Sequence, residues 1–183
     1  MHLKVHIKYY LFFGLLYFFG ASSAAGLHLA YRLPLPALLS VPKALTLSFT
    51  DYALFISAVL EPLTLTFLTA FTLYACPVGV FLCLCAGISF GDLAMRYGLS
   101  KLSPFTHAAA LLFLIAFGVI VTLLATHTAL CRSALKSVAP EPKTLLREKT
   151  TFTTFQTYLC LSALAIVSAT ALYFFLVYFP IGL

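Results

Sequence analysis

Charged residues are scarce in this 183-residue chain. Only 9% of its residues are Asp, Glu, Lys or Arg, whereas 62% are hydrophobic. A water-soluble domain needs polar side chains over much of its surface, and this chain has too few of them to cover one. The composition therefore excludes an ordinary soluble protein and indicates that the lipid bilayer is the solvent.

Two further classes of protein lack their characteristic signals here. The strands of a transmembrane β-barrel alternate apolar and polar residues, whereas the hydrophobic runs of this chain are apolar on every face. A nucleic-acid-binding protein carries a basic stripe interleaved with exposed aromatic residues. The 11 Lys and Arg residues of this chain are instead scattered at the ends of hydrophobic runs. The net charge of +6 thus fits membrane topology better than a nucleic-acid partner.

Signals of an active site are also missing from the sequence. It has no Ser-His-Asp order, no HExxH motif and no phosphate-binding glycine loop. His107 and His127 are separated by about 30 Å along one predicted helix, too far to bind one metal ion. The five cysteines lie within or beside hydrophobic runs, where thiols behave as small hydrophobic groups. We predict a non-enzymatic protein with no cofactor, metal site or disulfide framework.

Long hydrophobic runs are what the chain does have. At roughly 20 residues per helical crossing, they predict an all-α, polytopic membrane protein with about five transmembrane helices in a single domain over residues 1–183. The predicted spans cover residues 9–30, 52–75, 77–91, 104–131 and 152–179. The second and third spans are expected to form a proline-broken helix pair, with a tight break at "ACPVG", residues 75–79.

Two alternatives to this division stay open at the sequence level. Residues 1–25 also have the basic start, apolar core and small residues of a cleavable signal peptide. The small residues of "GASSAAG", residues 20–26, equally suit close packing of a transmembrane helix. For the middle of the chain, an interfacial helix up to Leu60 and one kinked span from Pro62 to Phe90 would replace the helix pair.

The distribution of basic residues predicts the orientation. Residues 132–151 form a hydrophilic loop with the densest basic cluster, and the positive-inside rule makes this loop cytoplasmic. Five spans then place the N-terminus, with Lys4 and Lys8, in the cytoplasm and the C-terminus outside. Four spans would leave both lysines outside, so the basic residues favour five.

A few polar residues and glycines in the spans are candidates for a function. Glu61 lies within the second span and is expected to face the bundle or water, because a carboxylate in lipid costs about 3 kcal/mol or more. The open alternative is a protonated Glu61 or one near the membrane interface. Asp92 and Arg96 are spaced for a local ion pair where the third span ends. Gly87 and Gly91 are one turn apart, which predicts a close approach of a neighbouring helix, whereas Phe113 is expected to face lipid.

The middle of the chain resembles the stage II sporulation protein M family. The resemblance rests on a helix ending at Pro77, an apolar run, Gly-Ile-x-x-Gly at residues 87–91 and the polar turn "RYGLSK" at residues 96–101. The order of the parts also fits, from the lysine-containing start with "YYLFFGLLYFFG" to the final span. The resemblance implies helix-packing roles for Pro77 and the two glycines, and an external partner contact at Asp92 and Arg96.

Membership of this family implies a scaffold in the bacterial cell membrane, surrounded by membrane lipid. Such a scaffold anchors two peptidoglycan-cutting partners, stage II sporulation proteins D and P, at the septal membrane while the mother cell engulfs the forespore. The alternative is a small solute-binding membrane subunit of an importer, which has a similar size and span count. Its cavity would need polar groups at one depth, and Glu61, Tyr74 and His127 are the candidates. Neither function fixes the oligomeric state.

Overall fold

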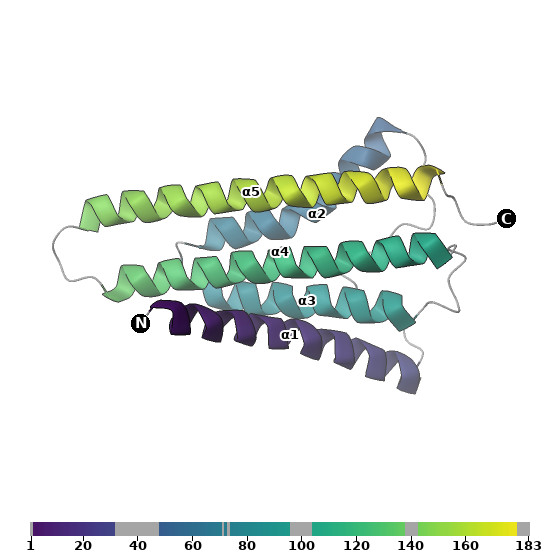
Figure 1. Ribbon diagram of the computed structural model, residues 1–183, viewed down its shortest axis with the longest axis horizontal. Coiled ribbons are helices and arrows are strands. Elements are labelled where there is room, and N and C mark those ends of the chain that lie inside the picture. Colours follow the sequence, from purple (N-terminus) through teal and green to yellow (C-terminus); the bar gives the residue numbers. More distant parts are fainter. Residues whose placement is uncertain are drawn as a thin grey trace.

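The computed structural model describes residues 2–31, 48–70, 72, 74–95, 104–137 and 143–178. These residues form five α-helices and short adjoining turns (Figure 1). The helices are α1 (His2–Tyr31), α2 (Phe49–Thr69), α3 (Ala75–Met95), α4 (Pro104–Ser137) and α5 (Lys143–Tyr178). Each contains a segment long and apolar enough to cross a membrane. The chain is therefore an all-helical, multi-pass membrane protein.

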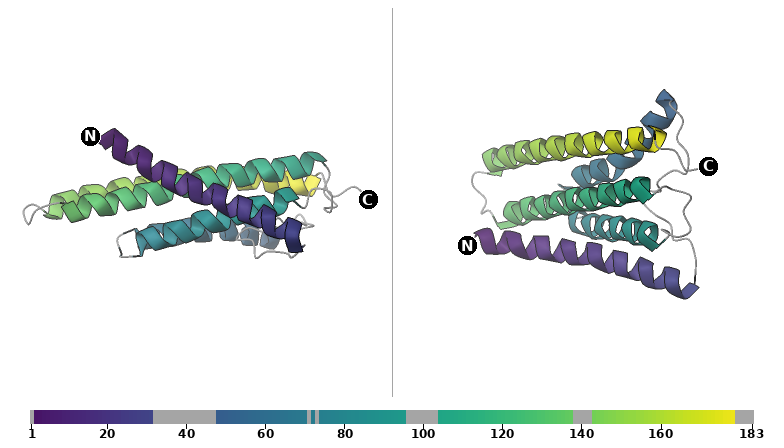
Figure 2. Two further views of the ribbon diagram at one scale, coloured as in Figure 1. Left: turned by 90° about the horizontal axis from the view of Figure 1, so that it is seen from below. Right: turned by 45° about the vertical axis from the view of Figure 1, so that its right-hand side comes forward.

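The helices pack side by side around α4. α1 packs on α3 and α4, α3 on α4, and α4 on α5, whereas α2 packs chiefly on α5. α1 runs obliquely across the neighbouring helices (Figure 2). The start of α1, the end of α4 and the start of α5 lie at one end of the bundle, and the end of α5 lies at the other (Figure 1). The start of α1 and the end of α5 are thus on opposite sides of a bundle with an odd number of candidate spans.

The buried side chains of the bundle are mostly apolar. The large ones that are most completely buried come from α1 to α4 and include Phe13, Val59, Leu63, Leu82, Leu114, Phe117 and Leu124, whereas α5 contributes the completely buried Ala165 and Ala169. Exposed leucine, phenylalanine and valine side chains cover the outer faces of the helices. An apolar exterior is costly in water and suits hydrocarbon, which agrees with the membrane assignment.

The break between the second and third helices lies earlier than the sequence indicated. α2 ends at Thr69 and α3 begins at Ala75, so the break falls between these two residues, where Ala70, Thr72 and Tyr74 are described. Pro77 lies in the first turn of α3, where a missing N–H removes no helical hydrogen bond. The proline thus begins the third helix and does not separate the pair. A single kinked span from Pro62 to Phe90 is not what forms.

The predicted cytoplasmic loop at residues 132–151 is largely helical. α4 continues to Ser137 and α5 begins at Lys143, so residues 132–137 and 143–151 belong to helices. The predicted span borders at residues 131 and 152 agree with the candidate spans, but polar residues end a membrane span without ending a helix. Lysine, arginine, glutamate, leucine and alanine all have high helix propensity. For the same reason α1 begins at His2, before the predicted start at residue 9.

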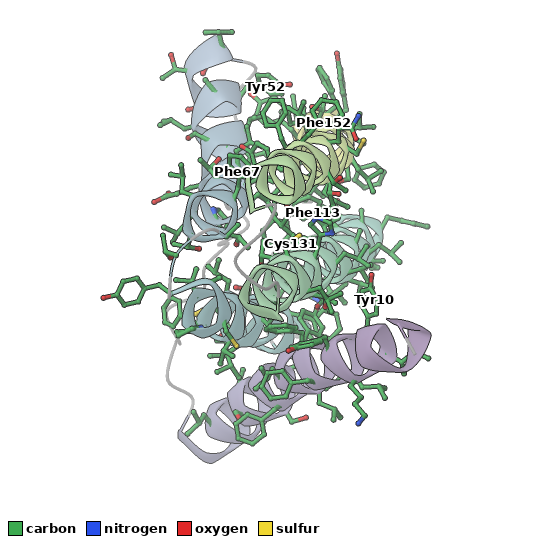
Figure 3. The ribbon with its side chains drawn as sticks, turned by 90° about the vertical axis from the view of Figure 1, so that its left-hand side faces the viewer. Tyr10, Tyr52, Phe67, Phe113, Cys131 and Phe152 are labelled. Atoms are coloured by element: carbon green, nitrogen blue, oxygen red, sulfur yellow. The ribbon has the colours of Figure 1, made fainter. Side chains whose placement is uncertain are left out.

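Phe113 does not face lipid as the sequence suggested. Its side chain is only 5% exposed, and its ring centroid lies 6.3 Å from that of Phe55 and 6.1 Å from that of Phe117. Figure 3 shows Phe113 between α4 and α5. The reason is the central position of α4, which has neighbours on several sides and so buries much of its surface.

Candidate functional site

Gly87 and Gly91 bring α3 into direct backbone contact with α1. A Cβ atom added at Gly87 would overlap the carbonyl oxygen of Tyr17 and lie 3.0 Å from the nitrogen of Ala21. At Gly91, an added Cβ would lie 3.0 Å from the Cα of Ala21. Real Cβ atoms need more space than this, so only glycine fits either position. We call this contact the α1–α3 seam. It consists of Gly87 and Gly91 on α3 and Tyr17, Gly20 and Ala21 on α1.

Gly20 completes this seam from the side of α1. An added Cβ at Gly20 would lie 3.2 Å from the nitrogen of Ile88 and closer still to the carbonyl oxygen of Leu84. Gly20 opens the small-residue segment at residues 20–26, which thus supplies the α1 half of the contact. Small residues on both helices let the backbones approach, and dispersion contacts between backbones hold transmembrane helices together.

Two aromatic side chains of α1 fill spaces that glycines leave on α3 and α4. The Tyr17 ring lies over Gly118, where an added Cβ would be 2.7 Å from the ring carbon Cζ. The Tyr17 hydroxyl donates a hydrogen bond of 3.3 Å to the carbonyl of Leu114. One turn earlier, Phe13 lies against Gly79, 3.2 Å from an added Cβ. The sequence carried one signal for these contacts, the isolated glycines within predicted spans.

Hydroxyl groups join α2 to α5. The oxygen atoms of Tyr52 and Thr170 are 3.0 Å apart, and those of Thr64 and Tyr158 are 2.9 Å apart. Near the start of α2, the Tyr173 hydroxyl donates to the carbonyl of Ser48 at 3.1 Å. Tyr52 and Phe67 lie between the two helices in Figure 3. These bonds span 94 to 125 positions of the sequence, so no local pattern could have indicated them.

Replacing Thr64 with valine is expected to cost about 0.6 kcal/mol of unfolding free energy, the average for a hydrogen bond between transmembrane helices. The variant keeps the shape of the side chain and removes its bond to Tyr158. The unfolding free energy can be measured by titrating detergent-solubilised protein with dodecyl sulfate and following helicity by circular dichroism. Thr157→Val is the matched control, because Thr157 bonds only to Thr153 of its own helix. Equal effects would contradict a bridging role for Thr64.

Glu61 does not face the bundle. Its side chain is exposed on α2, whereas Val59 and Leu63 are completely buried. Two residues correspond to a rotation of about 200° around a helix, so Glu61 points away from the side that packs on α5. The sequence allowed Glu61 to face the bundle or water, and the structure excludes the bundle. The sequence did not show which face of α2 is buried, because α2 is apolar on most of its surface.

Asp92 lies inside the bundle, in the last turn of α3. Its side chain is only 6% exposed, and the nearly buried Thr106 and His107 open α4 at the same end of the molecule. Burial of Asp92 disagrees with an external contact surface at this position. The physical reason is that α3 continues past Asp92 to Met95, so the helix does not end at the acid. Arg96 and its expected ion pair lie outside the described residues.

The three candidates for a solute-binding cavity do not converge. Glu61 is on the outer face of α2, and Tyr74 is 67% exposed in the turn before α3. His127 lies on α4, where its Nε2 atom is 3.4 Å from the sulfur of Cys131. That sulfur is also 3.2 Å from the hydroxyl of Thr154, which links α4 to α5. His127 is thus part of another helix-to-helix contact.

Some of the described polar groups join one helix to another, whereas others, such as Thr66, Ser89 and Thr157, donate to a carbonyl of their own helix. Within the described part of the chain, no group of three or more His, Cys, Asp or Glu side chains could hold a metal ion. The interhelical bonds hold the helices in fixed positions, and Glu61 is directed outward. Such an arrangement can fix outer surfaces for neighbouring proteins in the membrane. The chain matches no protein-family model, no curated protein and no solved structure.

Proposed function

We propose that the chain is a non-enzymatic scaffold of the bacterial cell membrane, similar to stage II sporulation protein M. Its partners are peptidoglycan-degrading proteins, of the kind of stage II sporulation proteins D and P, held at the septal membrane during engulfment. The observation that carries the proposal is that polar side chains form hydrogen bonds between helices. Tyr52, Thr64 and Tyr173 all join one helix to another, and so supply a fixed body on which partners can assemble.

Purification in mild detergent tests the scaffold. The full chain, tagged and expressed in its own host, is expected to co-purify with peptidoglycan hydrolases. The same tag on an unrelated membrane protein of five spans is the control for non-specific binding. Co-purification of an ATPase module without any hydrolase would contradict the scaffold and favour the importer subunit.

The proposed orientation has the N-terminus in the cytoplasm and the C-terminus outside. The basic residues at positions 132–149 and the N-terminal Lys4 and Lys8 support it, because the end of α4, the start of α5 and the start of α1 share one end of the bundle (Figure 1). In a cysteine-free background, a cysteine at Leu183 is expected to react with an impermeant maleimide in intact cells. A cysteine at His2 is expected to react only after lysis. Labelling of His2→Cys in intact cells would contradict a cytoplasmic N-terminus.

A further inference from the structure

The outer face of α2 carries a regular stripe of exposed residues with an acid at its centre. The stripe consists of Leu54, Ala58, Glu61, Leu65 and Leu68. Successive members are four, three, four and three residues apart, the spacing of a helix face that packs lengthwise on another helix. Leu54 and Leu68, at its two ends, are 63% and 64% exposed. We call these five residues the Glu61 stripe.

Glu61 lies deep within the span of α2. Its Cα is about 12 Å along the helix axis from Thr69 and farther from Phe49, at a rise of about 1.5 Å per residue. The candidate span covers the whole of α2, so the carboxyl group lies well inside its apolar stretch. A carboxylate exposed to hydrocarbon is costly, and such residues normally pair with another group.

A second hydrogen-bond acceptor lies one turn before Glu61. Pro62 has no N–H, so the helix cannot supply its usual donor to the carbonyl of Ala58. Ala58 is exposed on the same face as Glu61. The nearby Ser57 hydroxyl donates to the carbonyl of Leu54 at 2.9 Å, so its proton is used within the helix. In a membrane, a carbonyl released by proline is satisfied by neighbouring helices or side chains.

The described chain has no base that could pair with Glu61. Lys8 is the only lysine or arginine among the side chains that the structure describes. It lies on α1, which packs on α3 and α4 on the far side of the bundle from the outer face of α2. A second copy of the chain would bring another Glu61 and another carbonyl acceptor to the same depth. Neither the described residues nor a second copy supplies these donors, which points to a different protein.

We propose that the Glu61 stripe is the docking surface for a partner transmembrane helix that carries one lysine or arginine near its midpoint. This inference rests on the proposed scaffold function and names the kind of partner helix the scaffold holds. An ammonium or guanidinium group supplies several N–H donors, enough for both the Glu61 carboxylate and the Ala58 carbonyl. Small or apolar residues on the partner would pack against Leu54, Leu65 and Leu68, with the shallow crossing angle of left-handed helix pairs.

A model helix tests the docking surface directly. The probe is a synthetic transmembrane peptide of leucine and alanine with one central lysine, labelled with a donor dye. The full chain carries an acceptor dye and is reconstituted in lipid vesicles. Energy transfer is expected to show binding at least about tenfold tighter than for the same peptide with a central leucine. Equal binding of the two peptides would overturn the proposal.

Variants of the chain locate the binding to the stripe. Glu61→Gln removes the charge at an exposed position and is expected to abolish the preference for the lysine peptide, whereas Glu61→Asp is expected to retain most of it. The double variant Glu61→Gln, Leu164→Glu places an acid on the exposed middle of α5, where no proline frees a carbonyl. Restored preference in that variant would show that any exposed acid suffices, which overturns the assignment to α2.

Self-association is the competing occupant, and energy transfer between two labelled copies of the chain detects it. Transfer that depends on Glu61 between copies, without preference for the lysine peptide, would replace the partner helix by a second copy. Failure of docking and failure of the scaffold function are distinguishable. If hydrolases co-purify equally with the parent and with Glu61→Gln, the scaffold function is supported and the docking surface is contradicted. If the lysine peptide binds but no hydrolase co-purifies, the docking surface is supported and the scaffold function is contradicted.

Discussion

Replacing Gly87 with leucine is expected to prevent assembly of the bundle and to remove most of the folded protein from the membrane. A Cβ at Gly87 would overlap the carbonyl oxygen of Tyr17, and the obstacle is backbone, which cannot move aside without shifting α1 as a whole. Overpacking a core typically costs about 1–3 kcal/mol. Separating two backbones along the α1–α3 seam is expected to reach or exceed the upper end of that range. Membrane-fraction levels and unfolding free energies measure the loss.

Other glycines of the chain provide the controls for this substitution. Added Cβ atoms at Gly14 and Gly26 would meet nothing within 4 Å, although both residues are on α1 beside the seam. Gly14→Leu and Gly26→Leu are therefore expected to change the level and the unfolding free energy only slightly. Gly87→Ala is expected to fall between Gly87→Leu and the parent. A similar loss in Gly14→Leu and Gly87→Leu would show that leucine in a span, not the seam, is responsible.

Replacing Tyr17 with alanine is expected to lower the unfolding free energy by about 3–5 kcal/mol, the usual cost of deleting a buried aromatic ring. The ring is nearly buried between α1, α3 and α4, and its removal also leaves the Leu114 carbonyl without the hydroxyl donor. Tyr17→Phe keeps the ring and is expected to cost only about 0.6 kcal/mol, the average for an interhelical hydrogen bond. Titration with dodecyl sulfate measures both variants. Similar costs for the two would contradict a packing role for the ring.

A double-mutant cycle then tests the contact between Tyr17 and Gly118. Gly118→Ala alone is expected to be destabilising, because its Cβ would lie 2.7 Å from Cζ of the tyrosine ring. In the Tyr17→Ala background the same methyl group enters empty space. The two effects are expected to be non-additive by about 0.5–3 kcal/mol, as for residues in direct contact. Additive effects would place the ring elsewhere.

The fold class and the five helices could be predicted from the sequence because a membrane span is a local property. A run of about 20 apolar residues is sufficient to identify it, whatever the rest of the chain does. Gly87 and Gly91 likewise indicated a close contact through their spacing alone. Their partners on α1, Tyr17 and Ala21, could not be identified, because spacing along one helix carries no information about which other helix lies opposite.

The sequence did not indicate how each helix is rotated about its own axis, and so which of its faces is buried. In water, the polar face of a helix shows which side is buried, but these helices are apolar nearly all round. The direction of Glu61 and the burial of Asp92 were missed for that reason. The position of the break between α2 and α3 was missed for a different reason. Residues 70–74 include no glycine or proline, so Pro77 was the more conspicuous signal.

The pattern of helix contacts also sets an order of events during synthesis. The helices enter the membrane in chain order, yet α1 packs on α3 and α4, and α2 packs chiefly on α5. The first two helices to emerge are therefore not each other's partners. The side of Phe55 that packs on Tyr173 stays uncovered until α5, the last of the described helices, enters the membrane. A nascent chain that stalls before α5 therefore exposes to lipid a face of α2 that the finished protein covers.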